Sequence, residues 1–187
     1  MPGTPSSLQR KPFWAPVGLA AASALVAALV IALSAWLLVT AKSTTVIVVR
    51  EAEMASNGGT DPALSPAGQS RAELLARMFG DARLKEHVDA IYVWPTQGTQ
   101  TTARPLATRL GIKPVVVSQD DAHALARRML REYRGGRILV VAPGGAARDL
   151  AAALSGASDI PLATDFGTLY IVTVPRIGRA NLLSVEY

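Results

Sequence analysis

A charged cluster follows an apolar, β-branched run that begins at residue 43. The run ends in Arg50, and Glu51 and Glu53 come directly after it. An arginine guanidinium can hold the oxygens of a phosphate, whereas a carboxylate can serve as general base, nucleophile or metal ligand. These three side chains are therefore the first candidates for a catalytic or binding site.

Two carboxylates alone indicate a metal site only weakly. Glu51 and Glu53 would share one face of a strand, which is an arrangement that could hold a cation. Because Glu53 also has another explanation, given below, we expect no metal and no cofactor. The chain contains no cysteine, which excludes disulfides, thiolate zinc sites and cysteine nucleophiles.

A glycine pair, Gly144 and Gly145, precedes the last long helix that the sequence predicts. Backbone N–H groups at the start of a helix can cradle an anion, although no lysine follows here as it does in phosphate-binding loops. We therefore count both glycines, with Arg50 and Glu53, as candidate ligand-binding residues. The competing interpretation, which we favour for Arg50, is a buried ion pair with Glu51 or Glu53.

The two histidines and an arginine-rich helix have ordinary explanations. His87 lies among charged residues before a strand and His123 lies near the start of an amphipathic helix, so both are expected at the surface. Water can solvate the basic face of that helix, and a partner or lipid surface is the alternative. The four arginines on this face are Arg127, Arg128, Arg131 and Arg134.

Strand and helix patterns alternate through the rest of the chain. Apolar runs bounded by turn residues predict strands, whereas apolar residues at helical spacing after a cap such as Ser65 predict helices. Pro105 requires a kink in its helix or a later start. This order predicts an α/β fold, a three-layer sandwich with a mainly parallel sheet, helices on both faces and a C-terminal antiparallel hairpin. The predicted strands are 43–50, 89–94, 114–118, 137–142, 169–174 and 181–185, and the predicted helices are 66–80, 99–110, 120–133 and 146–154.

The parallel arrangement predicts where a site would form. In parallel α/β sheets, ligands bind beyond the carboxyl ends of the strands. The first, second and fourth strands end at Arg50, Trp94 and Ala142, so the loops that follow them should converge on one crevice. The charged cluster and the glycine pair both fall in these loops.

Five segments of the domain resemble the histidine phosphatase superfamily, the phosphoglycerate mutase-like proteins, and in particular its small single-domain members. No single segment is very specific, whereas their order and spacing together are. The resemblance extends from about residue 45 to residue 187. The segments are Val-Ile-Val-Val-Arg-Glu-Ala-Glu at 46–53, Leu-Ser-Pro-Ala-Gly-Gln at 64–69, Asp-Ala-Ile-Tyr-Val at 89–93, Thr-Gln-Thr-Thr-Ala-Arg-Pro-Leu-Ala at 99–107 and Ile-Leu-Val-Val-Ala at 138–142.

The resemblance implies a phosphatase site that lacks most of its reactive residues. In the family's first motif, Arg-His-Gly/Ala-Glu, the histidine attacks phosphorus and the arginine holds the phosphoryl oxygens. Arg50 and Glu53 match this motif, but Glu51 stands at the position of the nucleophile. The family carries a second arginine where this chain has Gly98 or a neighbour, and a second histidine where it has Pro143. Of these four central residues, the sequence retains only the first arginine.

The charge of this altered site determines the function that we expect. Losing one donor to a transition-state oxyanion commonly slows a reaction by about 10²- to 10³-fold, and two donors are replaced here. A carboxylate about 4 Å from a phosphate charge is opposed by roughly 4 kcal/mol at an effective dielectric constant near 20. We therefore expect a catalytically inactive relative that acts in binding or as a component of a membrane complex. The alternative is an active phosphatase of phosphomonoesters or phosphohistidine that works through Glu51.

An uncharged segment precedes the domain. Residues 12–41 contain no charged side chain, and residues 17–39 are almost wholly Ala, Val, Leu and Ile. As a helix, residues 17–39 would extend roughly 34 Å, enough to cross a hydrocarbon core of about 30 Å, and Trp14 and Trp36 would lie near its ends. We expect a transmembrane helix at 17–39. The alternative is a signal peptide cleaved after Ala41, although its apolar region would be unusually long.

The distribution of charge predicts the orientation of this helix. Arg10 and Lys11 precede it without an acidic partner, so the positive-inside rule places residues 1–16 in the cytoplasm and exports the domain, residues 43–187. The net charge is +5, but three cations flank the apolar segment and all 14 acidic residues lie beyond it, so the domain is nearly neutral. We therefore expect the membrane to be a partner and a membrane protein to be a further candidate partner, and we expect no nucleic-acid binding.

Overall fold

The computed structural model describes residues 15–39, 42–56, 59–81, 87–117, 121–160 and 166–187. The chain divides into two compact units, Met1–Thr40 and Ala41–Tyr187, which are treated separately below. The basic residues on which the orientation was predicted, Arg10 and Lys11, lie outside the described residues, as does Trp14.

The first unit contains one long apolar helix, α1, at Ala15–Val39. Its segment Gly18–Trp36 has a mean hydropathy of 2.2, and none of it is buried by other parts of the protein. At about 1.5 Å per residue, the 25-residue helix α1 is longer than the hydrocarbon core of a bilayer, about 30 Å, is thick. By length and composition it can cross a membrane, and a signal sequence would meet the same two criteria.

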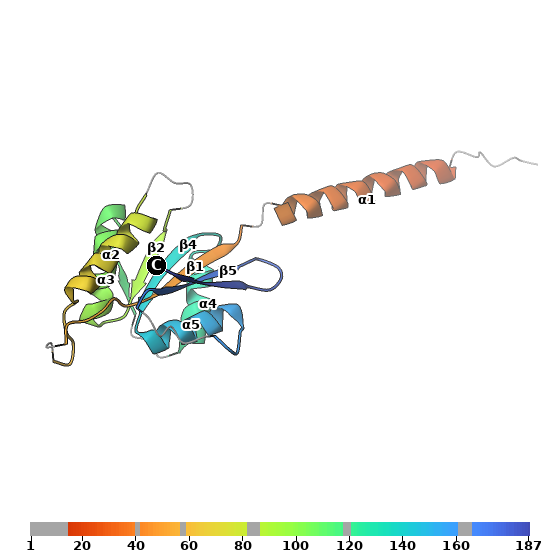
Figure 1. Ribbon diagram of the computed structural model, residues 1–187. Helices are drawn as coiled ribbons and strands as arrows, with labels where there is room; N and C mark the ends of the chain where they lie inside the picture. The colour runs from red at the N-terminus through yellow and green to blue at the C-terminus, as the bar shows by residue number, and fades with distance from the viewer. Residues whose placement is uncertain (1–14, 40–41, 57–58, 82–86, 118–120, 161–165) are drawn as a thin grey trace, which may run out of the picture. The chain divides into compact units, whose positions relative to one another are not determined.

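The second unit is built on one six-stranded sheet in the order β3-β2-β4-β1-β5-β6 (Figure 1). Four neighbouring strands are parallel, and β5 and β6 are antiparallel additions at one edge. The predicted mainly parallel sheet with a C-terminal hairpin is therefore confirmed. The strands are β1 (Thr44–Arg50), β2 (Ala90–Val93), β3 (Val115–Val116), β4 (Arg137–Ala142), β5 (Thr168–Val174) and β6 (Asn181–Glu186).

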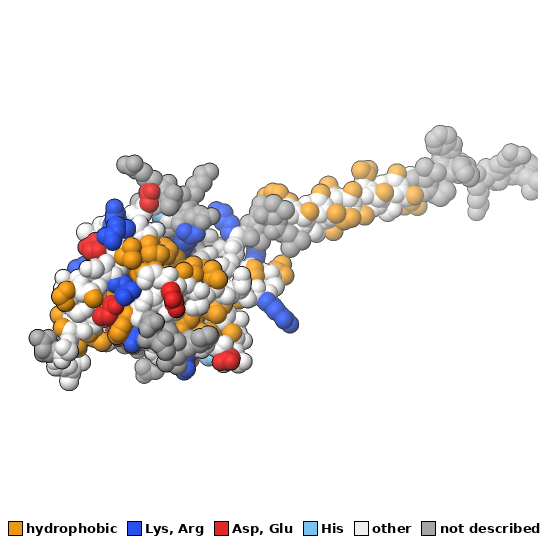
Figure 2. Space-filling model, viewed as in Figure 1, with side chains coloured by type: hydrophobic (Ala, Val, Ile, Leu, Met, Phe, Trp, Pro, Cys, Tyr) orange, Lys and Arg blue, Asp and Glu red, His pale blue; other side chains and the backbone are white. Residues whose placement is uncertain are grey.

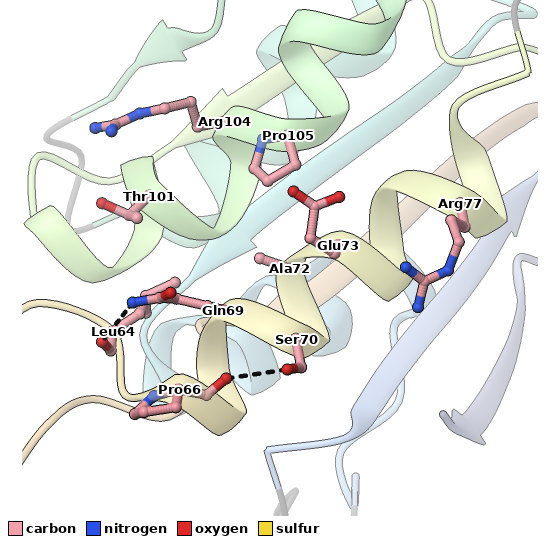
Figure 3. A pocket seen from close by; sticks show the side chains of 10 residues that line it. All are labelled: Leu64, Pro66, Gln69, Ser70, Ala72, Glu73, Arg77, Thr101, Arg104 and Pro105. Carbon is pink, nitrogen blue, oxygen red and sulfur yellow. Dashed lines mark hydrogen bonds between the residues drawn. The ribbon is translucent and has the colours of Figure 1, made fainter.

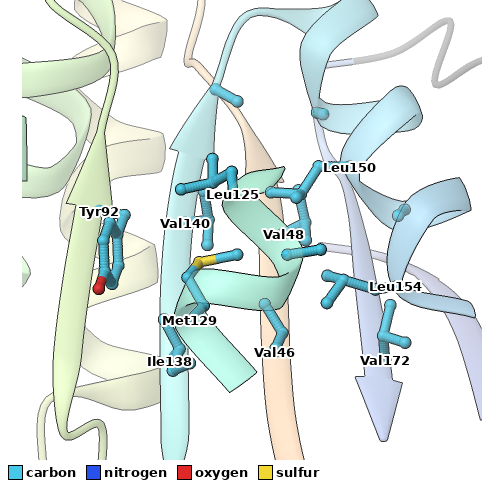
Figure 4. Close-up of a cluster of buried hydrophobic side chains, with 14 of the residues drawn as sticks. Val46, Val48, Tyr92, Leu125, Met129, Ile138, Val140, Leu150, Leu154 and Val172 are labelled. Carbon is cyan, nitrogen blue, oxygen red and sulfur yellow. The ribbon is translucent and has the colours of Figure 1, made fainter. Parts of the chain in front are cut away.

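Helices cover both faces of this sheet, which makes three layers. Helices α2 (Pro66–Phe79) and α3 (Gln97–Leu110) lie on one face, and α4 (Ala122–Glu132) and α5 (Gly144–Ser155) lie on the other. Because successive residues of a strand point to opposite faces, β1 contributes to both cores. Val46 and Val48 pack toward α4 and α5, as Figure 4 shows, whereas the residues that alternate with them pack toward α2 and α3.

Two helix starts differ from those predicted. Helix α3 begins at Gln97 rather than Thr99 because the Thr96 side chain caps it, and it continues through Pro105. The start that we predicted was therefore too late. Helix α5 begins at Gly144 rather than Ala146, with Pro143 at its N-cap position. The glycine pair, predicted as part of a turn, forms the first turn of a helix.

The other boundaries are close to the predictions. Ser65 caps α2 by accepting a hydrogen bond from the Gly68 N–H, and Pro66 opens the helix as predicted. Asp121 caps α4, so this helix begins at Ala122; Asp120, where we placed its start, lies outside the described residues. Strand β3 is only two residues long, and Ser118, the end of the predicted strand, also lies outside them.

Candidate functional site

The carboxyl ends of β1, β2 and β4 lie side by side, and the loops that follow them meet there. Arg50 and Ala142 are register partners at the ends of β1 and β4. The Glu51 N–H donates to the Ala142 carbonyl at 3.0 Å, which continues the pairing one residue beyond the strand. The Ala52 N–H in turn donates to the Thr102 hydroxyl of α3 at 3.0 Å. These two hydrogen bonds therefore fix the segment after β1 against the end of β4 and against α3.

Arg50 lies at the first turn of α5. A Cβ atom added to Gly144 would lie 3.0 Å from Arg50 Nε, so the guanidinium passes directly over this glycine. Its other face contacts the ring of Phe166, with 4.2 Å between the Arg50 Cζ and the ring centroid. Glycine at 144 therefore gives a cation access to a helix N-terminus, and both the guanidinium and the helix dipole favour an anion.

Glu51 is the buried member of the cluster, with 8% of its surface exposed. Its Oε2 accepts a hydrogen bond from the Thr96 hydroxyl at 3.4 Å. Burial raises the pKa of Glu51, the Thr96 hydrogen bond and the Arg50 charge oppose that rise, and the Asp61 charge adds to it. The hydrogen bond and the Arg50 charge therefore offset only part of the free-energy cost of removing the carboxylate from water.

Gly98 lies against the Glu51 carboxylate in the first turn of α3. A Cβ atom at position 98 would lie 2.9 Å from Glu51 Oε2 and 3.3 Å from the Met54 sulfur. Any side chain at position 98 would therefore require the carboxylate to move. The sequence analysis placed the second arginine of the family at Gly98 or a neighbour, and in the structure Gly98 lies against Glu51, the residue at the nucleophile position.

Glu53 has a different partner from the one predicted. Arg71 of α2 donates to both carboxylate oxygens, from Nε at 3.0 and 3.1 Å and from Nη2 at 2.6 Å. Hydrogen bonding to Arg71 is the main cause that lowers the pKa of Glu53, and Arg50 contributes only through its charge. The direct ion pair of Glu53 is therefore with Arg71, not with Arg50. The sequence analysis missed Arg71 because eighteen positions separate it from Glu53.

Asp61 is a third acidic residue at this site, and the sequence analysis missed it. Both of its carboxylate oxygens accept from the Gln97 N–H, at 2.8 and 3.0 Å, so it caps the N-terminus of α3. A carboxylate at this place is favourable because the first turn of a helix presents unpaired N–H groups and a partial positive charge. A side chain of the protein itself, Asp61, thus supplies the negative charge that the N-terminus of α3 favours.

The remaining predicted residues are spread over the domain. Gly145, in the first turn of α5, has open space where a side chain would be. His87 lies 3.5 Å from Asp89 near the amino end of β2, and His123 lies at the start of α4. Among the described residues, no group of three or more potential ligand side chains is arranged to hold a metal ion.

A cleft with a volume of about 530 Å³ lies elsewhere, between α2 and α3. Figure 3 shows that its two arginines, Arg77 and Arg104, lie toward opposite ends, and that Gln69 and Ser70 hydrogen-bond to nearby backbone carbonyls. Its charged groups do not converge on one point as they do at the strand ends. We therefore assign the candidate site to the strand ends around Arg50 and Glu51.

Solved structures with the same fold include several phosphatases. The protein histidine phosphatase SixA complexed with tungstate matches with a TM-score of 0.63 and 16% identity, covering 76% of this chain and 96% of that one. A mycobacterial glucosyl-3-phosphoglycerate phosphatase matches with a TM-score of 0.59 and 16% identity, covering 75% of this chain and 97% of that one. A phosphoserine phosphatase variant from Entamoeba histolytica, in complex with phosphoserine, matches with a TM-score of 0.58 and 15% identity, covering 76% of this chain and 96% of that one. No curated protein matches this sequence.

Fold and site together define an α/β domain whose candidate site lies beyond the carboxyl ends of a mainly parallel sheet, where such folds bind their ligands. The family model described as histidine phosphatase superfamily (branch 1) matches residues 46–120, a segment that includes Arg50, Glu51 and Gly98. This match and the shared fold support the assignment of the domain to the histidine phosphatase superfamily. The matched segment ends before β4, so Pro143 lies beyond it.

Proposed function

We propose that this protein is a membrane-anchored, catalytically inactive member of the superfamily that acts by binding or as a component of a membrane complex. One observation carries the proposal: a buried carboxylate, Glu51, occupies the position of the nucleophile and lies against Gly98. A carboxylate in this place opposes a phosphoryl group rather than attacking it. The glycine supplies no cation to offset that repulsion.

The charges around Glu51 support the same conclusion. Asp61 lies close enough to act on the Glu51 carboxylate, and it already caps α3. Arg71, the cation that contacts Glu53, has both of its carboxylate-binding nitrogens engaged by that residue. Carboxylates that do become phosphorylated rely on a metal or on further cations to offset the repulsion. A phosphate monoester would therefore meet one arginine and two nearby carboxylates.

The anchor forms the second part of the proposal. Helix α1 is long and apolar enough to span a bilayer. We assign residues 1–16 to the cytoplasm, residues 17–39 to the membrane and residues 43–187 to an extracytoplasmic domain, because Arg10 and Lys11 precede the helix without acidic partners. The domain would then meet partners at or near the membrane surface.

Restoring the missing residues tests the proposal directly. The purified protein should hydrolyse p-nitrophenyl phosphate no faster than a buffer control. The variant Glu51→His/Gly98→Arg/Pro143→His should gain measurable turnover, because it returns a nucleophile, an oxyanion donor and a proton donor to the crevice. A matched control, Glu51→Ala/Gly98→Arg/Pro143→His, keeps the added donors without a nucleophile and should stay inactive.

A single observation favours the alternative function. Burial raises the pKa of Glu51, and carboxylates with raised pKa values are frequent among general acids and bases. Under this alternative, Glu51 would act as base or nucleophile in an unusual phosphatase. Turnover by the unmodified protein that disappears in Glu51→Gln would establish the alternative and refute the inactive assignment.

A further inference from the structure

A basic cleft lies at the opposite end of the sheet from the candidate site. It has a volume of about 330 Å³ and is lined by three cations, Lys42, Arg134 and Arg176. The rest of its lining is a threonine and three apolar residues, and none of these lining residues is acidic. Three like charges around one cleft repel one another unless water or an anion screens them.

The fold brings these cations together from three distant segments. Lys42 lies just before β1, and a Cβ atom added to Gly135 would contact the Lys42 side chain, so the chain after α4 packs closely against it. The Gly135 N–H also donates to the Thr44 hydroxyl at 2.9 Å. Thr44 pairs with Val174 at the end of β5, which places the β5–β6 connection beside the start of β1.

The connection between β5 and β6 adds an exposed apolar side chain to this basic end. Ile177 is 74% exposed and lies between Arg176 and Arg179, which are both exposed. Figure 2 shows basic and hydrophobic side chains next to each other at the tip of this hairpin. An exposed large apolar residue flanked by arginines suits the boundary between lipid headgroups and acyl chains, where long basic side chains can reach the phosphates.

We propose that this basic end, formed by Lys42, Arg134, Arg176 and Arg179 with Ile177 at its tip, binds the anionic headgroups of phospholipids. The proposal rests on the membrane anchoring that we propose for α1. Only Thr40 and Ala41 separate α1 from Lys42 in the sequence, so an anchored helix would hold Lys42 close to the headgroups. A basic residue at an anionic membrane surface strengthens binding by roughly fivefold.

Anchoring and headgroup binding together would orient the domain. With its basic end on the lipid, the domain would turn the opposite end of the sheet away from the membrane. That end carries the crevice around Arg50 and Glu51. A soluble phosphate ester could use the same charges, but the sequence proximity of Lys42 to α1 and the exposed Ile177 both favour lipid as the ligand.

The absence of cysteine allows a clean test with one introduced thiol. The full chain carrying Ile177→Cys, labelled with an environment-sensitive fluorophore, is placed in nanodiscs of phosphatidylcholine with or without phosphatidylglycerol. Phosphatidylglycerol should shift the emission to the blue and slow quenching by acrylamide severalfold. The same label at Ser70→Cys, in the first turns of α2, should respond equally in both lipids.

Charge-reversal variants distinguish this site from a general attraction to the membrane. Arg176→Glu/Arg179→Glu in the Ile177→Cys background should abolish the effect of phosphatidylglycerol. The charge-matched control Arg104→Glu/Arg148→Glu, on α3 and α5, should retain it. Equal quenching at position 177 in both lipids, or an equal loss in the control, would refute the lipid site.

Two further readouts identify the ligand and the role of the anchor. Excess glycerol phosphate should leave the protection at position 177 unchanged, and its removal by this soluble ester would show that the cleft binds free phosphate esters instead. Co-elution of protein and nanodisc reports anchoring separately. A chain that fails to co-elute contradicts the anchoring and the lipid site together, whereas one that co-elutes without protection contradicts the lipid site alone.

Discussion

At the scale of single residues, Glu51 and Gly98 behave as a pair. The Glu51 carboxylate is buried against Gly98, where an added Cβ atom would lie only 2.9 Å from Glu51 Oε2. Glycine at position 98 therefore lets Glu51 adopt its place, and an arginine at position 98 would demand that Glu51 move or change. Glu51 and Gly98, the two departures from the family pattern, occupy the same space. Restoring the family residue at only one of the two positions should therefore destabilise the domain.

The raised pKa of Glu51 predicts a pH-dependent gain of stability in Glu51→Gln. Because the pKa is higher in the folded state, folding binds protons and stability falls as pH rises from about the usual value of 4.5. Glutamine is similar in size and does not ionise. The variant should therefore match the parent in acid and exceed its melting temperature by a few degrees at neutral pH, as measured by calorimetry.

A phosphate titration of the same two proteins tests the charge of the crevice. If Glu51 offsets Arg50, millimolar phosphate should leave the parent's melting temperature unchanged, since a ligand stabilises only in proportion to RT ln(1 + [L]/Kd). Glu51→Gln should show a phosphate-dependent rise that added salt weakens. A large phosphate shift in the parent would show a working anion site and count against the inactive assignment.

At the scale of elements, two glycines in the first turns of helices have opposite surroundings. Gly68 of α2 faces the backbone of Glu53, and a Cβ atom there would overlap the Glu53 carbonyl oxygen. Gly145 of α5 faces open space. The close approach at Gly68 holds α2 against the loop after β1, and so supports the Glu53–Arg71 ion pair.

Alanine at these two positions should therefore change stability in opposite directions. Gly68→Ala should destabilise the domain by about 2 kcal/mol or more, because a rigid backbone oxygen must move. Gly145→Ala should stabilise it by about 0.5 kcal/mol, because alanine restricts the unfolded chain and meets no obstacle. Urea denaturation of both variants checks this, and a neutral Gly68→Ala would show that α2 is not fixed at this contact.

At the scale of the whole molecule, the apolar helix and the α/β domain are separate compact units. If α1 spans the membrane as proposed, the full chain should stay in the membrane fraction after alkaline carbonate extraction. A chain lacking residues 1–41 should be released. Recovery of the full chain in the supernatant, or of a shortened product beginning near Lys42, would instead favour the cleaved signal peptide.

Orientation needs its own measurement. A phosphatase reporter that is active only outside the cytoplasm, fused after Tyr187, should be active, because Arg10 and Lys11 retain the N-terminus inside. Replacing both basic residues with glutamate should reduce the fraction of chains with that orientation. A reporter that is active only in the cytoplasm would contradict the proposed topology.

The sequence by itself determined the order of strands and helices, because apolar periodicity and capping residues are local properties. Strand β4 was predicted with its observed limits, and the fold class followed from the alternation of elements. The resemblance to the superfamily followed from the order of short motifs. The errors fell at helix starts. Thr96 and Pro143 are N-cap residues, and the two residues after each of them, which we predicted to precede the helix, already belong to it.

Only the tertiary structure decided which charges meet. Arg71 takes Glu53 as its partner across eighteen positions, and Asp61 caps a helix thirty-six positions away; neither contact has a local signal. The burial of Glu51 depends on the closeness of Gly98, and the basic end depends on three segments joined by strand pairing. Local patterns specify elements because neighbours in sequence always interact, whereas a site depends on distances that exist only once the sheet has formed.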